Sequence, residues 1–129
     1  MEPVPPPAPG PRRPSVLVVD DDLQVRRWLQ EAVAGLGYDV EAAADGPEAL
    51  AAFRRIKHDV VATDMMMPGM TGWELMTALR GIEPALPIIV LTAYGFGLER
   101  EARRHRVTLL HKPVRLPTME QALRDACAG

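Results

Sequence analysis

The chain has 129 residues, of which 47% are hydrophobic and 25% charged, and its formal net charge is −2 at pH 7. This length suits one domain with a buried core, and the charge gives no general attraction for nucleic acid or an anionic membrane. No apolar run approaches the roughly 20 residues of a membrane-spanning helix, and the start does not resemble a secretory signal, so we expect a cytoplasmic protein. The single cysteine, Cys127, excludes an intramolecular disulfide and a cysteine metal cluster.

Proline dominates the start of the chain and accounts for seven of the first 14 residues. Such a segment lacks both backbone amide donors and apolar side chains for a core. We therefore interpret residues 1–14 as a solvated tail or linker, with a docking peptide for a partner as the alternative. We expect the folded domain to span residues 15–127.

From residue 15 onward, short apolar runs alternate with segments of helical periodicity, as in βαβ units around a parallel sheet. Most of the expected strands are nearly continuous Val, Ile and Leu, which is typical of a sheet covered by helices on both faces. The expected strands are 15–20, 39–43, 59–64, 87–92 and 107–111.

Helical segments are predicted after each strand. Gly37 offers a left-handed stop to the first helix, and Asp45-Gly46-Pro47 has the cap and early proline of a helix start. The third and fourth helices are expected at about 72–80 and 98–105. Two helices carry a one-sided apolar stripe, formed by Val25, Trp28, Leu29, Ala32, Val33 and Leu36 in the first and by Leu116, Met119, Leu123 and Ala126 in the fifth.

Polar residues stand where four of the expected strands end. They are Asp20 with Asp21 and Asp22, then Asp64, Thr92 and Lys112. Right-handed βαβ connections bring the ends of all parallel strands to one edge of the sheet, where ligand sites of such folds gather. Each residue alone has an ordinary explanation, such as a capping aspartate or a solvated lysine. Their combination predicts a functional site.

Carboxylates that meet at a sheet edge raise one another's pKa unless a cation joins them. Carboxylate oxygens suit a hard divalent ion such as magnesium, which pairs readily with phosphate oxygens. Two aspartates beside the metal and Asp64 carry three negative charges, and the metal with Lys112 carries three positive charges. An ionised Asp64 needs no general base to attack phosphorus, only charge screening and alignment, and Thr92 and Lys112 would hold the incoming oxygens.

The motifs at these strand ends resemble those of response regulator receiver domains of two-component systems, the CheY-like superfamily. They occur in the family's order over about residues 15–126: Val18-Val19-Asp20-Asp21, Asp64 followed by Met67-Pro68-Gly69 and Gly72, Leu91-Thr92-Ala93, and Lys112-Pro113. The resemblance implies a doubly wound α/β fold of the flavodoxin-like (βα)5 type, with five parallel strands in the order 2-1-3-4-5.

The resemblance also implies the roles of the site residues. Asp64 would be the phosphoacceptor, while Asp20, Asp21, Asp64 and the backbone carbonyl of Met66 would bind Mg²⁺ or Mn²⁺. Thr92, the Ala93 backbone amide and Lys112 would bind the phosphoryl group, with a cis bond before Pro113. A sensor histidine kinase or histidine phosphotransfer protein would donate the group, and an unknown downstream protein would receive the signal by docking. The domain would catalyse only its own phosphotransfer and slow autodephosphorylation.

Two departures from the family pattern bear on signalling. Leu109 stands where receivers commonly carry Tyr or Phe, and the segment between Thr92 and Lys112 is slightly short. Tyr94 could replace the missing aromatic, with surface packing as the alternative. Met66 offers no polar group that could orient an attacking water, which predicts slow loss of phosphate.

Other interpretations remain open from sequence alone. The chain could be a phosphorylation-independent interaction module or the receiver segment of a hybrid histidine kinase. An aspartyl-phosphate hydrolase would need an acid where Met66 stands. We interpret the three methionines at 65–67 as loop and packing residues rather than as ligands of copper. We interpret Asp22 as the cap of the first helix. We interpret the arginines at 100, 103, 104 and 106 as a solvated helix face rather than a DNA-binding surface, and the three histidines as scattered.

Overall fold

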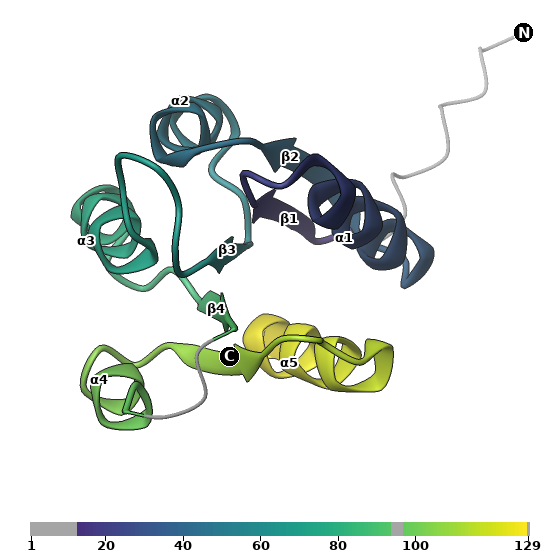
Figure 1. The fold of residues 1–129 in the computed structure, drawn as a ribbon. Helices are drawn as coiled ribbons and strands as arrows, with labels where there is room; N and C mark the ends of the chain where they lie inside the picture. Colours follow the sequence, from purple (N-terminus) through teal and green to yellow (C-terminus); the bar gives the residue numbers. More distant parts are fainter. Residues whose placement is uncertain (1–12, 94–96, 129) are drawn as a thin grey trace, which may run out of the picture.

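The protein folds as five strands that alternate with five helices (Figure 1). This computed structural model describes residues 13–93 and 97–128. Each expected strand is present within one residue of its predicted bounds. The elements are β1 (Ser15–Val19), α1 (Leu23–Gly35), β2 (Asp39–Ala43), α2 (Gly46–Ile56), β3 (Val60–Asp64), α3 (Gly72–Ile82), β4 (Ile88–Thr92), α4 (Glu99–Arg104), β5 (Thr108–His111) and α5 (Leu116–Ala128).

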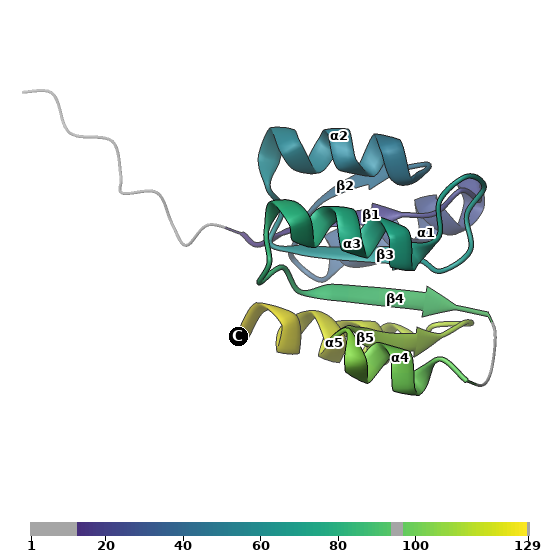
Figure 2. The same ribbon diagram turned by 90° about the vertical axis from the view of Figure 1, so that its left-hand side faces the viewer.

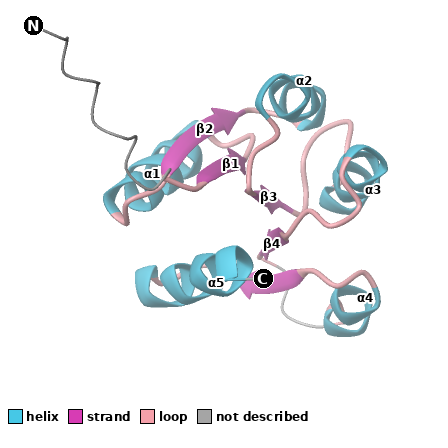
Figure 3. Cartoon of the chain, turned by 180° about the vertical axis from the view of Figure 1, so that it is seen from behind, coloured by secondary structure: helices cyan, strands magenta, loops and turns pink. Residues whose placement is uncertain are grey.

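The strands form one parallel sheet in the order β2-β1-β3-β4-β5, which confirms the predicted doubly wound topology. Helices α1 and α5 cover one face of the sheet, and α2, α3 and α4 cover the other (Figures 1 and 3). Alternate residues of each central strand supply the two cores. Leu17 and Val19 pack with Phe53 and Leu75 on the second face, and residues such as Val18 pack toward α1 and α5 on the first.

Side-chain caps fix the starts of three helices. The Asp22 carboxylate accepts hydrogen bonds from the backbone N–H groups of Gln24 and Val25, which confirms its predicted role as the cap of α1. Asp45 caps α2, and Thr71 with Glu74 forms a capping box at α3. With these caps, α1 begins at Leu23 and α3 at Gly72, so the loops 20–22 and 65–71 lie at the edge where β1 and β3 end.

Trp28 belongs to the apolar stripe predicted for α1 but is not buried in the core. Leu29 and Val33 of α1 are buried, whereas 44% of Trp28 is exposed. Successive residues of a helix point about 100° apart. When the apolar stripe is wider than the part of the helix that contacts the sheet, the residues at the edge of the stripe stay exposed to solvent. Leu116 is likewise 43% exposed at the start of α5. Trp28 borders a groove between α1 and the turn into α5, which is described below.

Helix α4 has six residues, fewer than the expected 98–105, and no side chain caps its start. Its far end is held by Arg80 of α3, whose guanidinium donates to the carbonyls of Leu86, His105 and Arg106. Within the described part of the chain, no helix has the length and apolar character to cross a membrane.

Candidate functional site

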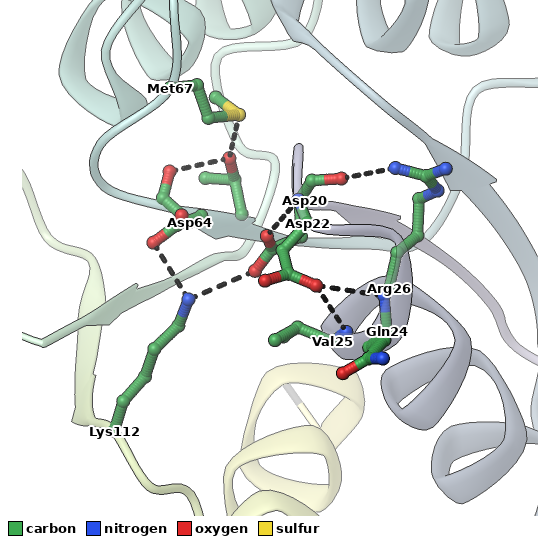
Figure 4. Close-up of polar contacts among 9 residues, drawn as sticks. Asp20, Asp22, Gln24, Val25, Arg26, Asp64, Met67 and Lys112 are labelled. Atoms are coloured by element: carbon green, nitrogen blue, oxygen red, sulfur yellow. Dashed lines mark hydrogen bonds and ion pairs between the residues drawn. The ribbon is translucent and has the colours of Figure 1, made fainter.

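Asp20 and Asp64, at the ends of two neighbouring strands, lie on either side of Lys112 at the edge of the sheet where the strands end (Figure 4). Asp20 follows β1 and Asp64 ends β3, and the register pairs Val19 with Thr63, so the two carboxylates are adjacent. One carboxylate oxygen from each of Asp20, Asp21 and Asp64 lies within 4.8 Å of the other two. The predicted meeting of the acidic strand ends is therefore confirmed.

Lys112 reaches the same point from the end of β5. Its Nζ lies 3.0 Å from Oδ2 of Asp20 and 3.2 Å from Oδ1 of Asp64. The Lys112 backbone N–H donates to the carbonyl of Thr92 at 2.7 Å, which anchors the start of the lysine loop on β4. The peptide bond between Lys112 and Pro113 is cis, as predicted.

The charges of this cluster do not balance. Burial and the neighbouring Asp20 charge raise the pKa of Asp64 above its usual value, although Lys112 opposes them. Burial alone would lower the pKa of Lys112, but its hydrogen bonds and charge interactions with Asp20 and Asp64 together raise it. Three carboxylates thus face one ammonium group, and the site favours a further positive charge.

The donor set fits a hard divalent cation. All three groups offer carboxylate oxygens, the ligands that such ions prefer, and their surplus charge equals that of a divalent ion once Lys112 is counted. Asp20 is buried and its Oδ1 accepts the Asp22 backbone N–H at 2.9 Å, which fixes the carboxylate in place. Asp21 is exposed, so the cation site opens toward solvent on its side.

The other predicted site residues lie in the expected places, and their roles remain predictions. Thr92 ends β4 and is buried, between the strands that carry Asp64 and Lys112. Ala93 follows it in an exposed bend. Met66 lies two residues after Asp64 and is 51% exposed. Tyr94 falls outside the described residues.

The loop after β3 depends on a glycine at position 72. The Gly72 backbone N–H donates to the carbonyl of Met65 at 2.8 Å. An added Cβ would lie 2.9 Å from the backbone oxygen of Asp64, closer than real Cβ contacts allow. Any larger residue would therefore displace the backbone at Asp64. Met65 and Met67 are buried, as predicted for packing residues.

Sequence reasoning missed Arg26 of α1. Its guanidinium donates to the backbone carbonyl of Asp20 at 2.8 Å and so holds the loop that carries the acidic pair. The only signal was an arginine one turn into a helix that starts at the site, which is too common to be informative. Among the described residues, the group of possible metal ligands contains aspartates and no histidine.

Comparisons with known proteins agree with the fold and the site. The sequence profile of the response regulator receiver domain matches residues 16–124. The structure superposes on the chemotaxis protein CheY4 of Vibrio cholerae with a TM-score of 0.83 and 33% sequence identity, covering 89% of this chain and 99% of that one. The chain therefore belongs to the response regulator receiver domain family.

Other relatives carry this domain within larger proteins. The response regulator MprA of Mycobacterium tuberculosis is 45% identical over 87 residues, which are 67% of this chain and 38% of MprA. The probable transcriptional regulator ycf27 of Porphyridium aerugineum is 43% identical over 82 residues, 64% of this chain and 34% of that protein. The match thus spans about a third of these relatives' length. The receiver domain of the hybrid histidine kinase CckA is 29% identical with a TM-score of 0.74, covering 88% of this chain and 98% of that one.

Proposed function

We propose that this receiver domain accepts a phosphoryl group on Asp64 from a sensor histidine kinase or a histidine phosphotransfer protein. The observation that carries the proposal is the position of the Asp64 carboxylate, 3.2 Å from the Lys112 ammonium and within 4.8 Å of ligand oxygens of Asp20 and Asp21. A nucleophile, a cation for the phosphoryl oxygens and a metal-ligand set thus share one sheet edge.

In the proposed transfer, a carboxylate oxygen of Asp64 bonds to phosphorus while the bond from phosphorus to the donor's histidine nitrogen breaks. The carboxylate attacks as an anion, so no protein base is needed. Lys112 balances negative charge on the transferred oxygens, and the Thr92 hydroxyl and Ala93 backbone amide bind them. Mg²⁺ or Mn²⁺, held by Asp20, Asp21, Asp64 and the Met66 carbonyl, would screen the repulsion between carboxylates and phosphoryl oxygens.

The output would be a shift between conformations that a partner protein recognises. Thr92 and Lys112 follow the new phosphoryl group and move the loops that carry them. Couplings of this kind are worth about 1–3 kcal/mol, which changes a partner's affinity severalfold to about a hundredfold. Leu109 is partly buried on the α4 side of β5 and has no polar atom, so the shift must reach α4 without the usual aromatic side chain. We place the domain in the cytoplasm, with no direct DNA or membrane contact of its own.

Two alternative functions are each supported by one observation. The likeness to the CckA receiver supports a receiver segment of a hybrid histidine kinase as a second setting for the same chemistry. Leu109 supports a phosphorylation-independent interaction module. The receiver segment of a hybrid kinase requires a reactive Asp64, whereas the interaction module does not. The next experiment therefore tests whether Asp64 is reactive.

The decisive experiment measures intact mass after incubation with a small-molecule phosphodonor, with and without Mg²⁺. We expect one phosphoryl addition that requires Mg²⁺ and is absent from Asp64→Asn. Asp125→Asn, an exposed carboxylate of α5, is the matched control and should be phosphorylated like the wild type. No addition to a folded, Mg²⁺-binding protein would favour the phosphorylation-independent module.

Loss of the phosphoryl group should be slow. The exposed Met66 side chain cannot orient a water toward the acyl phosphate. We expect Met66→Asn to accelerate autodephosphorylation by about threefold to tenfold, less than the 10²–10⁴-fold of a positioned general base. Following the phosphorylated mass after removal of donor checks this, with Met66→Leu as the apolar control. Equal rates for Asn and Leu would remove Met66 from the explanation.

A further inference from the structure

An apolar groove runs between α1 and the turn into α5, beside the aspartate site. It encloses about 540 Å³ and is lined by Val25, Trp28 and Leu29 on one side and by Pro113 and Val114 on the other. Trp28 is 44% exposed, and its indole N–H makes no hydrogen bond to any residue that the structure describes. The groove therefore offers an aromatic surface and an unused donor.

The proline-rich segment precedes the other end of the two helices that flank this groove. The carbonyl of Pro14 accepts the backbone N–H of Asp39 at 3.0 Å, just beyond the loop that follows α1. Arg13 and Pro14 also line a hollow with Ala126 and Cys127 of α5. The described chain thus begins at the C-terminal ends of both helices that flank the groove, at the end of the sheet where α5 finishes (Figure 2).

The distances allow the segment to reach Trp28. Trp28 lies seven residues before Gly35, the last residue of α1, or about 10 Å along the helix axis. Twelve residues in the polyproline II conformation span about 37 Å. Residues 1–12 contain six prolines, which favour this conformation.

We propose that residues 1–12 bind back into the groove between α1 and α5, with proline rings packed on Trp28 and a backbone carbonyl accepting its indole N–H. Proline-rich segments bind aromatic-lined grooves because they lose little conformational entropy on docking. The covalent connection gives the segment an effective concentration in the millimolar range at the groove. If the free peptide bound with a Kd of about 1 mM, the segment would occupy the groove in about half of the molecules.

A docked segment would cover the groove beside Lys112, which lines the groove and also pairs with Asp20 and Asp64. A protein phosphodonor approaching from that side would have to displace it, whereas a small-molecule donor would not. This consequence rests on the proposed function, but binding of the segment does not. A structural readout can therefore test the inference even if Asp64 accepts no phosphoryl group.

The test uses the indole N–H signals of the two tryptophans, Trp28 and Trp73, in NMR spectra of ¹⁵N-labelled protein. The full chain is compared with a chain that starts at Arg13, which retains every described strand and helix. A full-length variant with Pro5, Pro6, Pro7 and Pro9 changed to Ser keeps the segment's length but not its conformation. Trp28→Phe and Trp73→Phe assign the two signals.

We expect the Trp28 signal to shift on shortening, the Ser variant to match the shortened chain, and the Trp73 signal to stay in place. A peptide of residues 1–12, added at millimolar concentration to the shortened chain, should move the Trp28 signal back. Identical Trp28 signals in the full and shortened chains would overturn the proposal. A shift that depends on protein concentration would also overturn it, in favour of a second copy's segment in the groove.

Discussion

Two charged clusters of this domain use the same kinds of side chain with opposite balance. The aspartate cluster, Asp20, Asp21, Asp64 and Lys112, sets three carboxylates against one ammonium, and the pKa of Asp64 is raised by burial and by Asp20. The glutamate cluster, formed by Glu41, Arg55 and His58, surrounds one carboxylate with two basic groups. Burial alone would raise the pKa of Glu41, but hydrogen bonds from His58 and Arg55 lower it.

The difference separates a cluster with surplus negative charge from one whose carboxylate is paired within the chain, although Nδ1 of His58 is buried with no hydrogen-bond partner among the described residues. In the glutamate cluster, Nε2 of His58 lies 2.8 Å from Oε1 of Glu41, and Arg55 pairs with the other oxygen of that carboxylate. Its partners all belong to the chain, so its charge contributes to folding. The aspartate cluster holds a surplus of negative charge that costs stability until a cation arrives. An uncompensated cluster at the ends of parallel strands therefore indicates function rather than structural support.

The largest effect on stability should come from the glutamate cluster. The His58 ring is buried and stacks on Phe53 with 6.2 Å between ring centroids. We expect His58→Ala to lower the free energy of unfolding by about 2–3 kcal/mol, because it leaves a cavity and removes a partner of Glu41. Phosphorylation of Asp64 should persist, since the ring lies away from the aspartate cluster.

Denaturant unfolding at pH 7 measures this loss. Arg54→Ala, an exposed change on the same helix turn as Arg55, is the control and should stay within about 0.5 kcal/mol of the wild type. A comparably small effect of His58→Ala would mean that the buried ring contributes no packing, and the comparison between the clusters would fail.

The sequence predicted the aspartate cluster because parallel strands end at one edge of the sheet. The strand order that places the ends carrying Asp20 and Asp64 side by side was implied by the resemblance to receiver domains. The glutamate cluster follows no such rule. Glu41 lies inside β2 and His58 in the loop before β3, and only their side-chain directions join them. For the same reason His58 was interpreted as one of three scattered histidines.

Sequence patterns were also insufficient to predict which helix residues are buried. Apolar spacing located α1 and correctly buried Leu29 and Val33, but it could not tell how wide a face the sheet would cover. The exposure of Trp28 was therefore not predicted, and the groove it borders was not anticipated. Arg26 was missed because its contact is with a backbone carbonyl, which no side-chain motif reports.

A smaller effect of opposite sign is expected from Asp64→Asn. The folded state raises the pKa of Asp64 and so favours its protonated form, which means that the ionised carboxylate costs stability as pH rises through its titration range. Removing the charge should increase the free energy of unfolding at pH 7 without metal, by less than the loss expected for His58→Ala. The gain should vanish at low pH.

Mg²⁺ sharpens this prediction. A ligand that binds only the folded state adds about 1.4 kcal/mol for each tenfold excess over its Kd. Titrating Mg²⁺ should therefore stabilise the wild type more than Asp64→Asn and reverse their order, and a chelator should restore it. Glu31→Gln, an exposed charge removal on α1, controls for general electrostatics. A metal-free Asp64→Asn less stable than the wild type would show that the cluster is already compensated.

The smallest effect should come from Glu41→Gln, and its sign is the reverse of that for Asp64→Asn. Because folding lowers the pKa of Glu41, its charge contributes stability above the unfolded-state pKa, and this is lost as pH falls through the folded-state value. Arg55 is largely exposed, which limits the contribution to about 0.5–1 kcal/mol at pH 7. Denaturant unfolding should show that Glu41→Gln is less stable than the wild type at pH 7. Below about pH 4 the two proteins should be equally stable. If Glu41→Gln were more stable than the wild type at pH 7, the charge of Glu41 would destabilise the fold, as the charge of Asp64 is expected to do. The balance of charge would then not distinguish the functional site from the glutamate cluster.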